Sequence, residues 1–68
     1  MMDASAPAKL HFEHGHFRIL WPGAFVICAA TGAQIQLEDL RYWSVDRQEA
    51  YASPEAALMR AAQLGLTP

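Results

Sequence analysis

The chain has 68 residues, 53% of them hydrophobic, and a formal net charge of −2 at pH 7, so it forms one small domain of marginal stability. Its five basic residues are scattered and no apolar run approaches the roughly 20 residues of a membrane span, which argues against nucleic acid and membrane as partners. Residues 1–10 contain no apolar signal-peptide core and a lone cysteine is typical of a reducing compartment, so we expect a soluble cytoplasmic protein.

The first third of the chain predicts an arm followed by a β-hairpin. Residues 1–8 are rich in small residues and proline without periodicity, which indicates a mobile arm before a single domain over residues 9–66. Apolar and polar residues alternate over 9–20, and a turn at His14-Gly15 sets the apolar side chains of both strands on one face. The predicted pairs are Glu13 with His16, Phe12 with Phe17, His11 with Arg18, and Leu10 with Ile19.

The middle of the chain predicts two more strands separated by glycine turns. Trp21-Pro22-Gly23 has the pattern of a type II turn with Gly23 at positive φ. Residues 24–29 are apolar on both faces, as in a strand that is covered on both sides. After the turn at Thr31-Gly32, residues 33–37 alternate as a half-exposed strand, and residues 37–40 predict a single helical turn or a loop.

The last part of the chain predicts a second hairpin and a helix. Aromatic and β-branched residues predict strands over 41–45 and 48–52. A helix over 54–64 follows, with Ser53 as its N-cap and Gly65 as the residue that ends it. The expected inward face consists of Ala57, Leu58, Ala61 and Leu64. The fold class is therefore α+β, mainly β: a small antiparallel β-meander with one C-terminal helix.

Three motifs between Pro22 and Arg60 resemble a known family. They are Cys-Ala-x-Thr-Gly at residues 28–32, Leu-Arg-Tyr-Trp-Ser-Val at 40–45, and Gln-Glu-Ala-Tyr at 48–51. In these motifs the chain is similar to short uncharacterised proteobacterial proteins of the family "domain of unknown function 2093". The resemblance implies a small β-rich domain with a terminal helix, and it assigns no activity, ligand or catalytic residue.

Cys28 opens a segment with the outline of a zinc-ribbon knuckle. In such a knuckle a second cysteine follows after two residues, but here Thr31 occupies that place and the chain has no other cysteine. We interpret residues 28–32 as a degenerate knuckle that keeps only the turn. A reactive cysteine needs a neighbouring base or positive charge, and Cys28 has apolar neighbours, which favours a buried, inert thiol.

The hairpin histidines offer an alternative function. His11, Glu13 and His16 share the polar face of the predicted hairpin, and imidazole with carboxylate is a donor set for zinc or a similar ion. Cys28 is a conceivable fourth ligand. Because His11 and His16 are diagonal across the hairpin and face solvent, a solvated strand face is the simpler interpretation.

Aromatic and basic residues mark the expected contact surface. Arg41, Tyr42 and Trp43 are adjacent, and Trp, Tyr and Arg are enriched at interface hot spots. Phe25 and Ile27 extend this surface along the apolar strand. Trp43 also fits a place in the core, and the sequence leaves both possibilities open.

These observations favour a non-enzymatic structural or interaction module without a cofactor. We expect a homodimer formed through the apolar strand or by edge pairing, or an accessory subunit of another protein, because a short meander leaves strand edges exposed. Exchange of an element about Trp21-Pro22-Gly23 is a further route to a dimer. The alternative is a zinc-type binding protein that uses the hairpin histidines.

Overall fold

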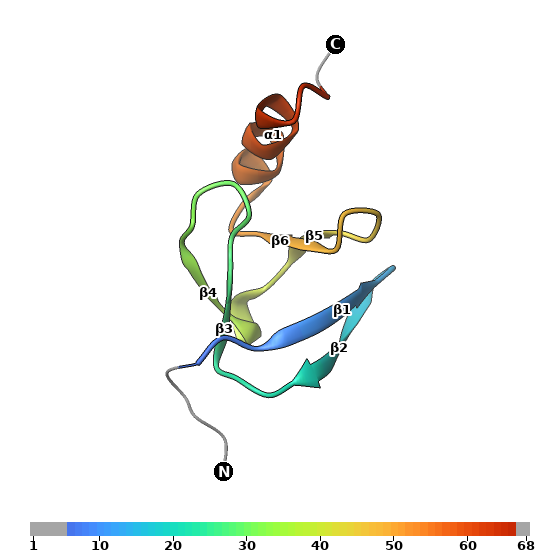
Figure 1. Ribbon diagram of the computed structural model, residues 1–68, viewed down its shortest axis with the longest axis vertical. Helices are drawn as coiled ribbons and strands as arrows, with labels where there is room; N and C mark the ends of the chain where they lie inside the picture. The colour runs from blue at the N-terminus through green and yellow to red at the C-terminus, as the bar shows by residue number, and fades with distance from the viewer. Residues whose placement is uncertain (1–5, 67–68) are drawn as a thin grey trace.

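Three hairpins and one helix make up residues 6–66, the part of the chain that this computed structural model describes (Figure 1). The elements are β1 (Lys9–Glu13), β2 (His16–Trp21), β3 (Phe25–Ile27), β4 (Gln34–Gln36), the 3-10 turn η1 (Leu37–Asp39), β5 (Tyr42–Ser44), β6 (Glu49–Tyr51) and α1 (Pro54–Gln63). The strands pair antiparallel as β1–β2, β3–β4 and β5–β6. The α+β, mainly β class is confirmed, with the strands in three two-stranded sheets.

The three hairpins meet at a common core. Single parallel bridges join Pro7 to Phe25 and Cys28 to Ala50, so β3 is connected to the N-terminal segment and to β6. In Figure 1 the β5–β6 hairpin lies between α1 and the β1–β2 hairpin, and β3–β4 runs along their side. The buried cluster comprises Ala8, Phe12, Val26, Cys28, Ile35, Leu40, Ala50, Tyr51 and Ala56. Every hairpin therefore contributes to one small core.

The register of the first hairpin is the predicted one. All four expected pairs are present, from Glu13 opposite His16 to Leu10 opposite Ile19. Gly15 has a φ of 83°, a value that glycine adopts without strain, whereas His14 does not need a positive φ. Beyond Leu10 the register shifts, and Lys9 pairs with Trp21. The turn thus fixes the hairpin as far as Ile19.

The expectation of an N-terminal arm fails at residues 6–8, while residues 1–5 lie outside the described part. The N–H of Ala8 donates to the Phe25 carbonyl (2.7 Å), and that of Ala24 donates to the Ala6 carbonyl (3.3 Å). Gly23 makes this contact possible because it has no side chain. Its φ is not positive, so the prediction of a type II turn with Gly23 at positive φ was wrong. A Cβ on Gly23 would lie 2.6 Å from the Pro7 carbonyl carbon and 2.7 Å from the Ala6 oxygen.

Replacing Gly23 with alanine is therefore expected to separate residues 6–8 from β3. The added methyl meets backbone atoms that cannot rotate away, and overpacking of this kind costs about 1–2 kcal/mol. Hydrogen exchange at the Ala8 amide should accelerate in the variant. Gly65→Ala serves as a control for location: it adds the methyl where no atom lies within 4 Å, and its strain at a φ of 71° is at the end of α1, so the Ala8 amide should stay protected. Unchanged protection of the Ala8 amide in Gly23→Ala would contradict the close-approach role.

The ends of α1 follow the prediction, but its inward face does not. Ser53 Oγ accepts from the Ala56 N–H (3.0 Å), and the N–H groups of Gly65 and Leu66 donate to the carbonyls of Ala62 (3.0 Å) and Ala61 (2.8 Å), as in a Schellman motif. Ala56 is buried, whereas Leu58 is 69% exposed and Leu64 is exposed as well.

The orientation of α1 follows from an ion pair. Arg60 points inward to Glu49 on β6, and a residue two positions earlier on a helix points about 200° away, which turns Leu58 toward solvent. The expectation that Leu58 and Leu64 pack inward was therefore wrong. No helix within residues 6–66 has the length and apolar character needed to cross a membrane.

Candidate functional site

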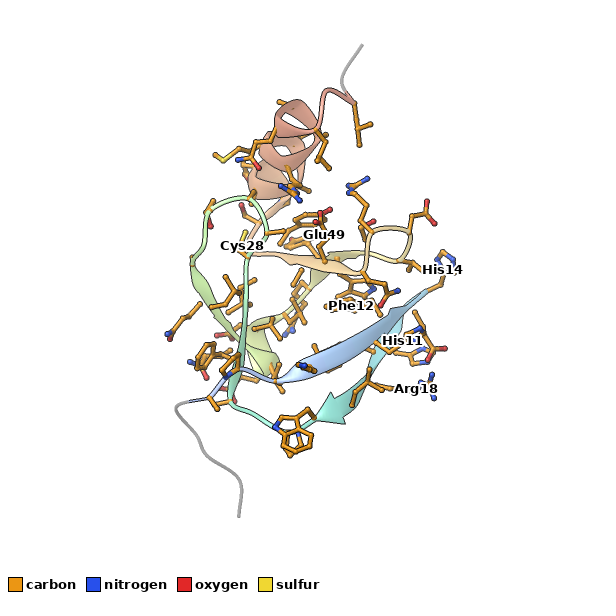
Figure 2. The ribbon with its side chains drawn as sticks, in the orientation of Figure 1. His11, Phe12, His14, Arg18, Cys28 and Glu49 are labelled. Carbon is orange, nitrogen blue, oxygen red and sulfur yellow. The ribbon has the colours of Figure 1, made fainter. Side chains whose placement is uncertain are left out.

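The predicted polar face of the hairpin gathers around Glu13. His16 Nε2 lies 3.4 Å from Glu13 Oε1 and His11 Nδ1 lies 3.7 Å from Oε2, but Arg18 Nε is closest, at 2.7 Å from Oε2 (Figure 2). Partial desolvation acts to raise the pKa of Glu13, and the charge and hydrogen bond of Arg18, with a contribution from the neighbouring His16 and His11, outweigh it, so the pKa lies below its ordinary value. The carboxylate thus already has a cationic partner.

This arrangement gives the metal-binding alternative no geometric support. No three His, Cys, Asp or Glu side chains in the described part of the chain converge as a metal site requires. Arg18 brings a positive charge to the carboxylate that would have to face a cation. Cys28 lies in the core, apart from His11 and His14 in Figure 2, and therefore does not join the hairpin residues.

The turn at Cys28 positions a buried thiol. The Gly32 N–H donates to the Cys28 carbonyl (2.9 Å), and the Ala52 N–H donates to Sγ (3.4 Å). Burial acts to raise the pKa of Cys28, and hydrogen bonds from Thr31 and from the Ala52 backbone outweigh it, so the pKa lies below its usual value. Because Cys28 is only 1% exposed, a dissolved substrate does not reach its sulfur. The structure places Cys28 as a packing residue of the core.

The five residues of the expected contact surface divide into two groups. Phe25 is buried in the core, and Trp43 is partly buried. The Trp43 Nε1–H donates to the Glu13 carbonyl (2.9 Å), and its ring stacks on Phe12 with centroids 5.9 Å apart. Arg41, Tyr42 and Ile27 remain exposed. Trp43 therefore joins the first and third hairpins.

Arg41, Tyr42 and Trp43 also border a groove that the sequence did not predict. It has a volume of about 840 Å³ and lies between the β1–β2 turn and β5. Its aromatic lining residues are Phe17, Tyr42, Trp43 and Tyr51. Phe17 meets the Trp43 ring edge to face with centroids 5.7 Å apart, which fixes one wall. The groove arises only when the first and third hairpins pack together.

A second unpredicted feature is the ion-pair network around Glu49. Arg60 contacts both carboxylate oxygens, through Nη2 at 2.9 Å and Nε at 3.1 Å, and Arg47 Nε lies 3.3 Å from Oε1. The Tyr51 hydroxyl donates to Oε1 at 2.9 Å. The hydrogen bonds from Arg60 outweigh the opposing effect of burial and hold the pKa of Glu49 below its ordinary value. Figure 2 shows Glu49 between the third hairpin and α1.

Gln48 forms a third unpredicted contact. Its Oε1 accepts from the Phe12 N–H (2.9 Å), and its Nε2 donates to the carbonyls of Phe12 (2.9 Å) and Val45 (2.8 Å). The carboxamide thus pairs with the outer edge of β1 as a neighbouring strand would. Gln48 is also the non-glycine residue at positive φ (53°) in the described chain. Gln48 and Phe12 are 36 positions apart, and no local pattern in the sequence indicates that they pair.

The end of β2 forms an exposed apolar segment. Ile19, Leu20 and Trp21 are 56%, 62% and 64% exposed, although they are consecutive in one strand. Neighbouring residues of a strand point to opposite faces, so this end of β2 is uncovered on both. We call residues 19–21 the β2 apolar edge. The sequence placed Ile19 on the inner face of the hairpin and left Trp21 ambiguous.

Comparison with known proteins identifies a family. The family described as "uncharacterized protein conserved in bacteria" (DUF2093) matches residues 19–60, which is more than half of the 68 residues. No curated protein and no solved structure matches the chain. The matched segment runs from the β2 apolar edge to Arg60, so it includes the Cys28 turn, the groove wall and the Glu49 network. The chain therefore belongs to the DUF2093 family of bacterial proteins.

Proposed function

We propose that the protein is a non-enzymatic interaction module of the cytoplasm that acts as a homodimer through the edge of β2. The β2 apolar edge supports this proposal, because a strand end exposed on both faces and along its side is a template for another strand. Within residues 6–66, β1 is the only strand that pairs with β2, so the outer side of β2 has no strand partner.

The hydrogen bonds of Phe12 show which backbone groups β2 offers. Opposed residues of an antiparallel pair alternate between exchanging hydrogen bonds and pointing these groups outward. Phe12 directs its N–H and C=O outward to Gln48, so Phe17, its partner in the register, does the same on the outer side of β2. Ile19 is two residues further along and has the same orientation. A second strand can therefore bond to Phe17 and Ile19.

Charge favours a second copy in one symmetric register. A register centred on Arg18 would set two guanidinium groups directly opposite one another, and like charges in that position are destabilising. Centring on Ile19 instead pairs Ile19 with its own copy and sets Arg18 opposite Leu20 of the second protomer. The outward-facing backbone groups of Ile19 then bond to their own copy, and the exposed apolar side chains of the two protomers cover one another.

The other routes to a dimer that the sequence offered have less support. β3 is paired with β4 on one side and bonded to Ala8 on the other, and Phe25 and Val26 are buried. Gly23 packs tightly against residues 6–8, so the Trp21-Pro22-Gly23 segment is held in place and does not resemble a loose hinge. Edge pairing of β2 uses a surface that needs no rearrangement.

Sedimentation velocity over about 10 µM to 1 mM tests the proposal. A pair of short strands buries less than the roughly 1,600 Å² of a standard interface, so we expect a dimer with a Kd in the micromolar range. Ile19→Lys sets two positive charges at the symmetry axis and should leave a monomer at every concentration. Leu58→Lys is the matched control, because Leu58 is equally apolar and exposed but lies on α1, and it should dimerise as the wild type does.

Two results would contradict the β2 interface. A wild-type monomer at 1 mM would remove the homodimer and favour the accessory-subunit alternative. Loss of the dimer in Leu58→Lys, with the dimer retained in Ile19→Lys, would place the interface on α1.

A further inference from the structure

The arginines of the described chain differ in their partners, and Arg41 stands apart. Arg18 pairs with Glu13 at 2.7 Å, and Arg47 and Arg60 pair with Glu49 at 3.3 and 2.9 Å. Among residues 6–66, no carboxylate lies within ion-pair distance of Arg41. Its Nη1 donates instead to the carbonyls of Glu38 (2.9 Å) and Leu40 (3.1 Å). These two bonds hold the guanidinium plane, while Nε and Nη2 make no hydrogen bond within the described residues.

The groove beside Arg41 has matching chemistry. Its charged or titratable lining residues are Arg41, His14, His16 and two tyrosines, and no aspartate or glutamate among residues 6–66 lines it. This absence is notable in a chain with a net charge of −2. The two aromatic residues that follow Arg41 in the chain, Tyr42 and Trp43, also line it. A volume of about 840 Å³ is within the range of small-molecule sites, about 300–1,000 Å³.

We propose that this groove binds a small amphipathic carboxylate, with Arg41 as the residue that anchors the carboxyl group. The two unoccupied donor nitrogens of Arg41 lie on one edge of the planar guanidinium and fit the two oxygens of a carboxylate. The apolar body of the ligand lies along the Tyr42 and Trp43 rings. The imidazoles of His14 and His16 are further polar groups of the lining.

The charge pattern selects this class over its alternatives. The aromatic walls by themselves would suit a cationic ligand. The positive charge of Arg41 would repel it, however, and no carboxylate of residues 6–66 lines the groove to offset this repulsion. Within the described part of the chain, one permanently charged side chain lines the groove, which matches a ligand with a single negative charge better than a dianion. The aromatic walls need an apolar ligand body to cover them. The anchor of this site lies on the segment before β5, outside the proposed dimer edge, whereas His16 and Phe17 of its lining belong to β2.

An NMR titration with matched ligands tests the inference. Indole-3-propionate supplies an aromatic body and a carboxylate, and indole-3-propionamide supplies the same body without the charge. With the ¹⁵N-labelled protein at pH 7.5 we expect saturable shifts of the Phe17, Tyr42 and Trp43 amides by the carboxylate, with a Kd of about 1 mM for a ligand of this size. The amide should bind at least about tenfold more weakly.

Three arginine variants and one dimer variant complete the design. Arg41→Gln should weaken binding of the carboxylate at least about tenfold, Arg41→Lys should recover part of it, and Arg18→Gln should leave it unchanged because Arg18 does not line the groove. Binding should persist in Ile19→Lys, which separates this site from the proposed dimer. Equal shifts with the amide ligand, no effect of Arg41→Gln, or no saturable shift up to 10 mM would each overturn the inference.

Discussion

Gln48→Ala is expected to lower the free energy of unfolding by about 2–3 kcal/mol. The substitution removes three hydrogen bonds and leaves the N–H and C=O of Phe12 without partners in a partly buried place. An unsatisfied buried backbone group costs about 1–3 kcal/mol. For a domain of this size each kcal/mol shifts the Tm by about 4–8 °C, so a fall of the order of 10–20 °C should appear in thermal unfolding. Urea unfolding should show a lower midpoint at an unchanged slope.

Three further variants separate the hydrogen bonds of Gln48 from its backbone strain. Gln48→Gly loses the same bonds but relieves the positive φ, so it should be less destabilised than Gln48→Ala by about 1 kcal/mol. Gln48→Glu keeps the size but sets a carboxylate oxygen against the Phe12 carbonyl, and it should not rescue stability. Gln34→Ala changes an exposed glutamine of β4 and should cost less than about 0.5 kcal/mol. An equally small loss in Gln48→Ala would show that the Phe12 contact contributes little.

Glu49→Gln is expected to lower the free energy of unfolding by about 2–3 kcal/mol at pH 7. The Glu49 side chain is only 15% exposed and accepts hydrogen bonds from Arg60, Arg47 and Tyr51. The variant keeps the shape but leaves two guanidinium groups without a counter-charge, and hydrogen bonds to charged groups contribute about 1.5–3 kcal/mol each. Thermal or urea unfolding measures the difference. Glu38→Gln, on an exposed acid of η1, is the control and should be nearly neutral.

The wild type and Glu49→Gln should also differ in how their stability responds to acid. The pKa of Glu49 is lower in the folded state than its ordinary value of about 4.3, so the unfolded state takes up the proton first on acidification. The stabilisation is complete above about pH 5 and is lost as the pH falls through the folded pKa. The gap in Tm between wild type and Glu49→Gln should therefore narrow from pH 7 to pH 3. A gap that stays constant over this range would show that the charge of Glu49 is not what stabilises the fold.

Local patterns in the sequence predicted the elements and one register. The His14-Gly15 turn fixed the hairpin pairs, and Ser53, Pro54 and Gly65 fixed the ends of α1. The strand positions were also correct to within a few residues, and the single turn at η1 was expected. These features depend on residues a few positions apart, whose backbone preferences and alternation are visible without knowledge of the rest of the chain.

The candidate site was predicted less well than the elements, because its residues come from hairpins that are far apart in the sequence and no local pattern links them. Arg41 and Tyr42 were expected at a surface and they line the groove, but the sequence did not show that Arg41 has no carboxylate partner among residues 6–66. The sequence was compatible with Trp43 in the core or at an interface. The hydrogen bond from its indole N–H to the Glu13 carbonyl shows that it packs between the first and third hairpins. Glu49 and Arg60 were assigned to separate elements, and nothing in their spacing of 11 residues indicates a pair.

The sequence by itself thus determined the α+β class, the succession of strands and helix, the turns and the first hairpin register. Only the tertiary structure decided which face of each element is buried and which is exposed to solvent. The Gln48 pairing with Phe12, the approach of Ala8 to Phe25, and the inward rotation of Arg60 join residues that are 11 to 36 positions apart. Such contacts depend on how the hairpins pack, which no local periodicity encodes. That packing also exposes the β2 apolar edge and forms the groove on which the two proposals rest.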